Sequence, residues 1–198
     1  MRIVFSALLF FFSIALSARE EPHSSLCESY FSPEDNVASR LIELIKAEKK
    51  SIKIAIYSLR HRGIVNALIE AKKRGIVVEM IVDPISVKGR SPLKRLSQEG
   101  VAIFVWNAQQ VEGQFSHKSK KRELMHHKFC LFHEELVWTG SFNFTYEADR
   151  SNHENAVVLH DEEGARKFVK EFEHLKKGTC LPYEQFIALQ NEKKSKKL

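Results

Sequence analysis

The stretch between residues 126 and 155 concentrates side chains that suit phosphoryl chemistry. His126-His127-Lys128 supplies an imidazole and an ammonium group, and Gly140-Ser141-Phe142-Asn143 follows with a hydroxyl and a carboxamide. If the apolar run 129–132 forms a strand, its alternating side chains put His126 and Lys128 on one face and His127 on the other. A histidine on that face can attack phosphorus while the lysine neutralises the phosphoryl oxygens.

Cleavage of a phosphodiester assigns a role to each of these groups. The neutral ring of His126, whose ordinary pKa is about 6.5, is available as the nucleophile near neutral pH. Lys128 would offset the charge on the non-bridging oxygens, with Asn143 and Ser141 as additional donors. We expect Glu154 to accept a hydrogen bond from the other ring nitrogen of a catalytic histidine, which fixes its tautomer and stabilises the imidazolium.

Three spaced blocks together resemble the phospholipase D superfamily and its HKD motif: His126-x-Lys128, Gly140-Ser141-x-Asn143 and Asn152-His153-Glu154-Asn155. The string 139–145 is the most specific part, and a looser resemblance extends over about residues 37–176. The chain is most similar to small bacterial nucleases with one motif per chain and to mitochondrial phospholipase-like proteins. The resemblance implies an α/β fold with a mixed β-sheet flanked by helices on both faces, a covalent phosphohistidine intermediate and no cofactor.

A single motif leaves the chain one catalytic group short. A second group must protonate the leaving oxygen, and in the family it is a histidine from a second motif. The economical solution is a homodimer in which two copies of His126 meet across the two-fold axis, as in single-motif relatives.

His133 departs from the family pattern, because the motif has an aspartate five residues after the lysine. A neutral imidazole accepts one hydrogen bond and carries no negative charge. Glu134 or Glu135 could fill the same space. The change could reduce the rate, shift the pH optimum or mark a catalytically weak protein that binds nucleic acid or lipid in the same phosphate cradle.

The substrate is open between two classes of phosphodiester. A formal net charge of +6 suits polyanions such as nucleic acid or anionic phospholipid. The polar segment 107–123 could follow a phosphate backbone, and Trp106 and Phe115 could stack on bases. Its cationic side chains are Lys118, Lys120, Lys121 and Arg122. Alternatively, these cations only solvate a loop, and Trp106 ends a buried strand. The first hypothesis is a nuclease with little sequence preference, and the second is a phospholipase D-type lipid hydrolase.

The N-terminus predicts export. Arg2 precedes an apolar run over 3–16, and the small residues Ala15, Ser17 and Ala18 suit cleavage of a signal peptide at 1–18. The protein would then be periplasmic or secreted, or membrane-anchored if the segment is retained. In an oxidising compartment, Cys27 and Cys180 at the two ends of the core could form a disulfide, although sequence does not fix connectivity. Cys130 reads as a buried small hydrophobe. No ligand spacing indicates a metal site.

Hydrophobic periodicity predicts alternating helices and strands. Ser32 and Pro33 are expected to begin a helix that ends near Lys50. Further helices are predicted at 64–73, 92–98 and 161–177, and strands at 51–59, 77–82, 101–106, 128–132, 136–139 and 156–160. The expected organisation is a lead-in at 19–31, a catalytic domain at 32–180 and a frayed basic tail at 181–198.

Overall fold

One mixed β-sheet forms the centre of the molecule. The computed structural model describes residues 27–107, 123–133 and 135–196. Within them, eight strands run in the order β1-β7-β6-β5-β2-β3-β4-β8. Three neighbouring strands are parallel: β2 (Ser51–Ile56), β3 (Val77–Val82) and β4 (Ala102–Trp106). The remaining pairings are antiparallel and involve β1 (Cys27–Ser32), β5 (Lys128–Phe132), β6 (Leu136–Gly140), β7 (Glu154–His160) and β8 (Cys180–Pro182).

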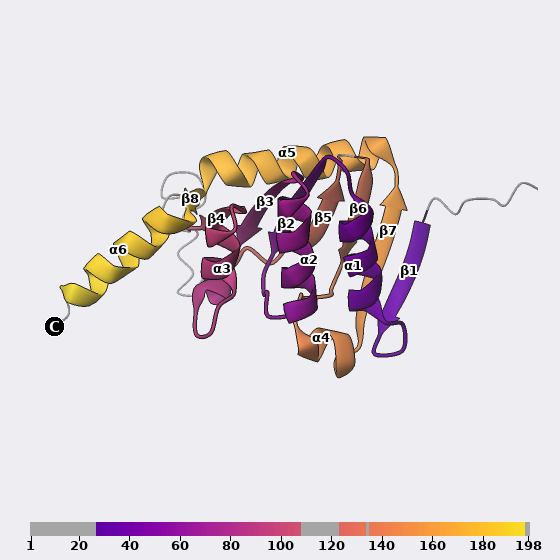
Figure 1. Cartoon of the computed structure of the whole chain (residues 1–198), viewed down its shortest axis with the longest axis horizontal. Helices are drawn as coiled ribbons and strands as arrows, with labels where there is room; N and C mark the ends of the chain where they lie inside the picture. Colours follow the sequence, from indigo (N-terminus) through magenta and orange to yellow (C-terminus); the bar gives the residue numbers. More distant parts are fainter. Residues whose placement is uncertain (1–26, 108–122, 134, 197–198) are drawn as a thin grey trace, which may run out of the picture.

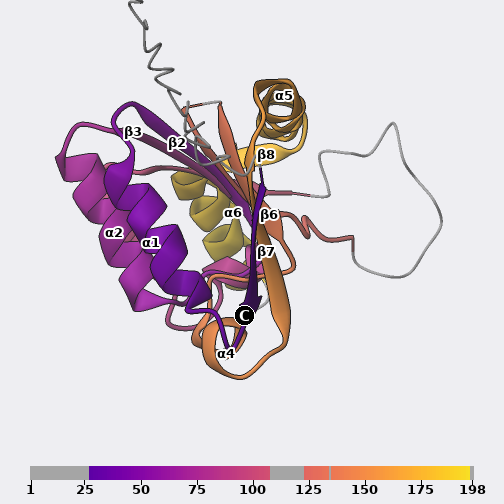
Figure 2. The same ribbon diagram turned by 90° about the vertical axis from the view of Figure 1, so that its right-hand side faces the viewer.

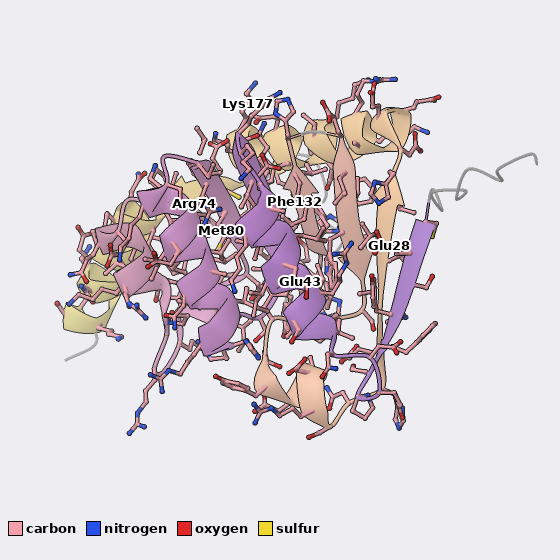
Figure 3. All side chains as sticks on the ribbon, turned by 45° about the vertical axis from the view of Figure 1, so that its right-hand side comes forward. Glu28, Glu43, Arg74, Met80, Phe132 and Lys177 are labelled. Atoms are coloured by element: carbon pink, nitrogen blue, oxygen red, sulfur yellow. The ribbon has the colours of Figure 1, made fainter. Side chains whose placement is uncertain are left out.

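Helices cover both faces of the sheet, which confirms the predicted fold class (Figures 1 and 2). One face carries α1 (Val37–Ala47), α2 (Arg62–Lys73) and α3 (Leu93–Gln98). The opposite face carries α5 (Glu162–Gly178), whose Phe172 is fully buried in a second apolar cluster. Met80 of β3 is buried between the sheet and the first layer, whereas Lys177 at the end of α5 is exposed (Figure 3). Two short helical elements, η1 (Pro84–Val87) and α4 (Tyr146–Arg150), follow β3 and β6, and α6 (Tyr183–Ser195) follows β8.

The register of the sheet brings chain segments that are distant in sequence to one edge, the one formed by the strand ends after Ile56 and Val82 and before Lys128. Parallel pairing sets Ile56 beside Val82, so the residues that follow β2 and β3 leave the sheet together. Antiparallel pairing sets Ile56 beside Lys128, so β5 begins at that same edge. The end of β6 and the start of β7 also meet there, since Gly140 pairs with Ala156. Each block of the sequence motif is therefore delivered to the same edge of the sheet.

The N-terminal boundary differs from the prediction. Residues 27–32 are a strand and not a disordered lead-in, and Arg40 of α1 holds Glu28 of β1 by hydrogen bonds of 2.9 and 3.0 Å. The helix start predicted at Ser32 and Pro33 is wrong: α1 begins at Val37 with Asn36 as its N-cap. Ser32 instead donates to the carbonyl of Asn152 at 3.1 Å. The predicted signal peptide lies outside the described residues. In the part of the chain that is described, no helix is long and apolar enough to span a bilayer.

Residues 180–195 form a strand and a helix and not the frayed tail that the sequence predicted. Leu181, Tyr183 and Phe186 are buried, because β8 pairs with β4 and α6 packs beside it. The predicted disulfide is wrong for a single chain. Cys27 lies in β1 and Cys180 in β8, which are the two outermost strands of the eight-stranded sheet. Seven strand spacings of about 4.8 Å separate these strands by roughly 33 Å, far beyond the reach of a disulfide.

Candidate active site

His126 and Lys128 form a pair at the start of β5. Lys128 Nζ lies 3.1 Å from His126 Nδ1 and donates to the His126 carbonyl at 2.7 Å. His127 points the other way, with its Nε2 3.2 Å from Glu171 of α5. The alternation predicted from the sequence is therefore confirmed, and His127 is exposed on its own face. Lys128 is only 7 % exposed, which fixes its ammonium group beside the imidazole.

Two residues that the sequence analysis missed support this pair. The ring of Tyr57, directly after β2, lies 4.6 Å from the His126 ring and 5.1 Å from Lys128 Nζ. Asp83, directly after β3, is fully buried and accepts hydrogen bonds from Met125 N at 3.2 Å and Ile85 N at 2.8 Å. A polar residue that immediately follows the apolar last residues of a strand is the signal that could have identified both.

The electrostatics favour a neutral histidine. Burial lowers the pKa of His126 below its usual value, the nearby Lys128 charge lowers it further, and Asp83 opposes the shift. Burial also lowers the pKa of Lys128, against the attraction of the Glu154 carboxylate. The net lowering of its pKa favours the neutral ring of His126, which is the state that a nucleophile needs.

Ser141 and Glu154 form the second part of the site. Ser141 Oγ donates to Glu154 Oε2 at 2.5 Å and accepts from Asn155 N at 3.0 Å. Asn152 Nδ2 donates to Glu154 Oε1 at 3.1 Å. Within the described chain Glu154 thus binds Ser141 and Asn152, and not the ring of its own His126. Its predicted hydrogen bond to a catalytic histidine stays a prediction for the histidine of a second copy.

Asn143 lies on a segment that is fixed to the end of β2. The Phe144 carbonyl accepts from Arg60 N at 2.7 Å and His61 N at 2.8 Å, and Phe144 N donates to the Ser58 carbonyl at 3.0 Å. Asn143 Oδ1 is buried and has no hydrogen-bond partner among the described residues. A buried carbonyl oxygen without a donor costs free energy, so Asn143 Oδ1 is ready to accept a hydrogen bond from a donor that enters the site.

The other predicted residues fall outside this cluster. His133 lies at the far end of β5, about 17 Å along the strand from Lys128, and its Nε2 accepts from Lys50 Nζ at 2.7 Å. Trp106 is 7 % exposed and belongs mainly to the core, as the alternative interpretation held. The cationic segment lies outside the described residues, as does Phe115; this covers Lys118, Lys120, Lys121 and Arg122. The described residues contain no group of three or more side chains suited to hold a metal ion.

The arrangement defines a class of enzyme. A histidine–lysine pair at the edge of an α/β sheet, beside a serine, an asparagine and a glutamate, is a phosphodiesterase site of the HKD type. The chain belongs to the phospholipase D superfamily, because the family model described as cardiolipin synthase, PLD-like domain, matches residues 41–176. Its activity class is therefore phosphodiester cleavage.

Relatives and solved structures agree with this assignment. A phospholipase D of Rickettsia conorii is 27 % identical over 166 residues, covering 80 % of this chain and 76 % of the relative. A mitochondrial cardiolipin hydrolase of Danio rerio is 29 % identical over 136 residues, or 68 % of this chain, which spans about half (54 %) of that relative. The structure of Nuc, a phospholipase D family member from Salmonella typhimurium, has 27 % identity and a TM-score of 0.66, and the match covers 79 % of this chain and 97 % of Nuc. NucT from Helicobacter pylori, at 22 % identity and a TM-score of 0.71, shares the fold over 79 % of this chain and 98 % of NucT.

Proposed function

We propose that this protein is an exported nuclease that hydrolyses nucleic-acid phosphodiester bonds through a phosphohistidine on His126. The observation that carries the proposal is the pairing of His126, whose pKa is lowered, with the buried Lys128: His126 Nδ1 and Lys128 Nζ lie 3.1 Å apart at one edge of the sheet. The similarity to Nuc over 97 % of its length and the net charge of +6 favour a nucleic-acid substrate. The apolar N-terminal run supports export.

The contact between Lys128 and His126 defines a resting state. A protonated Lys128 donates to Nδ1, so the ring proton then stays on Nε2. Attack through Nε2 requires that proton on Nδ1 instead. An incoming phosphodiester draws the Lys128 ammonium group onto its oxygens. Nδ1 is then free to carry the ring proton and to donate a hydrogen bond to a carboxylate.

The reaction then proceeds in two displacements. Nε2 of His126 forms a bond to phosphorus as the bond to the leaving oxygen breaks, and a second histidine donates a proton to that oxygen. Water next attacks the phosphorus, the nitrogen–phosphorus bond breaks, and the second histidine takes the proton of water. Lys128 and the side-chain amide nitrogen of Asn143 stabilise the charge on the non-bridging oxygens in both steps, while the Ser141 hydroxyl holds Glu154.

We propose that the second histidine is His126 of a second copy in a homodimer. The described chain brings one motif histidine to the site, and its Glu154 binds Ser141 and Asn152 rather than that histidine. A two-fold partner would supply the missing histidine. Sedimentation of the active protein as a strict monomer would contradict this arrangement.

The alternative function is a phospholipase D-type lipid hydrolase. The names of the Rickettsia and Danio relatives favour it. So does Leu124, which is 45 % exposed two residues before His126 and could contact a lipid surface.

A paired turnover assay tests both functions. Single-stranded nucleic acid and anionic phospholipid vesicles are offered to wild type, His126→Ala and His127→Ala. His127 is the matched control, because it is the neighbouring histidine but faces α5. We expect nucleic-acid cleavage in wild type and His127→Ala, and none in His126→Ala. Turnover of lipid alone would establish the phospholipase. Turnover of neither substrate, with binding of nucleic acid or lipid retained, would establish a catalytically weak binding protein.

A further inference from the structure

A groove runs between η1 and α6, on the β4–β8 side of the molecule. It consists of two adjoining hollows of about 290 and 460 Å³, and both are lined by Pro84, Lys88, Phe186 and Gln190. Helix α6 forms one wall of the groove. Both α6 and β8, the strand before it, lie after residue 176, where the family match ends. The groove is therefore built partly from a segment outside the matched domain.

The groove adjoins the active-site edge at two points. Pro84 follows Asp83, whose carboxylate accepts from Met125 N directly before His126. Glu123, which also lines the groove, lies three residues before His126 in the chain. Residues 83–84 and 123–126 therefore link the groove to the active-site edge, and a chain-like substrate bound at His126 has a route toward the groove along them.

The lining combines an aromatic and aliphatic floor with cations on both walls. The floor comes from Trp106, Leu181 and Phe186, which are 6–7 % exposed. Lys88 lies on the η1 side, and Lys193 and Lys194 lie on α6. Facing cations above an apolar floor suit a polyanion whose phosphates contact the walls and whose unstacked base covers the floor.

We propose that this groove binds a single-stranded segment of nucleic acid next to the bond that His126 cleaves. The inference rests on the proposed nuclease function and extends it, because it names the strand form of the substrate and the path that it takes. A duplex keeps its bases stacked inside and cannot place one on the floor, so the groove selects single strands. Affinity for single strands then depends on substrate length, while a small diester that fills only the catalytic centre is indifferent to the groove.

The test compares two charge-matched double variants. Lys88→Gln with Lys194→Gln removes one cation from each wall, and Lys46→Gln with Lys167→Gln removes two exposed lysines from α1 and α5. All four lysines are exposed, so neither pair disturbs the core, and matching thermal unfolding curves verify this. The readouts are kcat and KM on a twelve-nucleotide single strand and on bis(p-nitrophenyl) phosphate.

We expect the groove variant to lower the preference for the oligonucleotide over the small diester by about tenfold, through KM. Each lost phosphate contact reduces the slope of log affinity against log salt by about 0.7 for single strands, so two reduce it by about 1.4. The control pair should change the oligonucleotide preference and the salt slope by less than half of the changes in the groove variant. Equal effects in both pairs, or no effect in the groove pair, would overturn the proposal.

A binding measurement separates this inference from the proposed function. The His126→Ala protein, with and without the groove substitutions, is titrated with labelled single strand, duplex and anionic vesicles. Groove-dependent binding of the single strand supports the groove even if wild type cleaves no nucleic acid. Cleavage by wild type without groove-dependent binding retains the nuclease and refutes the groove. Groove-dependent binding of vesicles but not of single strands also refutes it and points to lipid.

Discussion

Replacement of Gly140 by alanine probes the contact that joins the two halves of the active site. Gly140 ends β6 with φ at +153°, directly before Ser141. A Cβ added there would overlap the Asn155 carbonyl oxygen and lie 2.9 Å from the Ala156 Cα. Both obstacles are backbone atoms of β7, so no side chain can rotate away. Strands β6 and β7 would have to separate where Ser141 binds Glu154.

The magnitude follows from two costs. Forcing a side chain into a tightly packed position costs about 1–3 kcal/mol. Holding a non-glycine residue in a sparsely populated backbone region costs a further 1–3 kcal/mol or so. We therefore expect the free energy of unfolding to fall by about 2–6 kcal/mol. Activity should fall further than the folded fraction does, because a shift of about 1 Å in a catalytic group can cost about a hundredfold in rate.

Urea unfolding and kcat/KM at a temperature where the variant is fully folded measure the two effects. Gly178→Ala is the control, since its added Cβ meets nothing within 4 Å at the end of α5. That variant should unfold within about 1 kcal/mol of wild type. The reasoning is refuted if Gly140→Ala unfolds at the same urea concentration as wild type, or if it is destabilised but fully active per folded molecule.

Four further outcomes test the chemistry of the site and its distance from His133. The acidic limb of the kcat/KM profile should lie below pH 6.5, since burial and Lys128 lower the pKa of His126 and attack needs the neutral ring. Asp83→Asn should move that limb to still lower pH, because Asp83 raises this pKa; an unmoved limb would show that Asp83 only supports the backbone. His133→Asp should change kcat less than about twofold and, by pairing with Lys50, add at most about 1 kcal/mol of stability in urea unfolding; a tenfold change in kcat would contradict the distance between this position and the site. EDTA should leave turnover of any cleaved diester unchanged, and loss of turnover on chelation would contradict a mechanism based on His126.

The central elements could be predicted because their patterns are local. The apolar run at β3 and the periodicity of α2 were both recognised from the sequence. The pair formed by His126 and Lys128 was also predictable, because alternation along one strand is a local property. Asp83 and Tyr57 were missed because their role depends on strand order. The antiparallel pairing of β2 with β5 brings Tyr57 to His126, and the parallel pairing of β3 with β2 brings Asp83 to the same edge.

The ends of the chain show where sequence patterns stop being informative. Cys27 and Cys180 flank the core in sequence, which suggested that they meet. In the fold, β3 and β4 lie on one side of β2, whereas β5, β6 and β7 lie on its other side. The two ends of the chain therefore form the outermost strands on opposite sides of the sheet. Strands β1 and β8 are edge strands stabilised by pairing with β7 and β4, and short sequences of that kind carry little periodicity of their own.

The same sheet order decides how His133 should be interpreted. From the sequence alone, a histidine in place of the motif aspartate left open a reduced rate, a shifted pH optimum or a catalytically weak protein. In the fold, β5 separates the two ends of the motif: Lys128 begins the strand at the active edge, and His133 follows it at the other. There His133 Nε2 accepts a hydrogen bond from Lys50 Nζ, a role that an aspartate oxygen could also fill. The substitution therefore changes a surface contact near α1 and leaves the groups around His126 untouched, so it gives no physical reason for the site to be inactive.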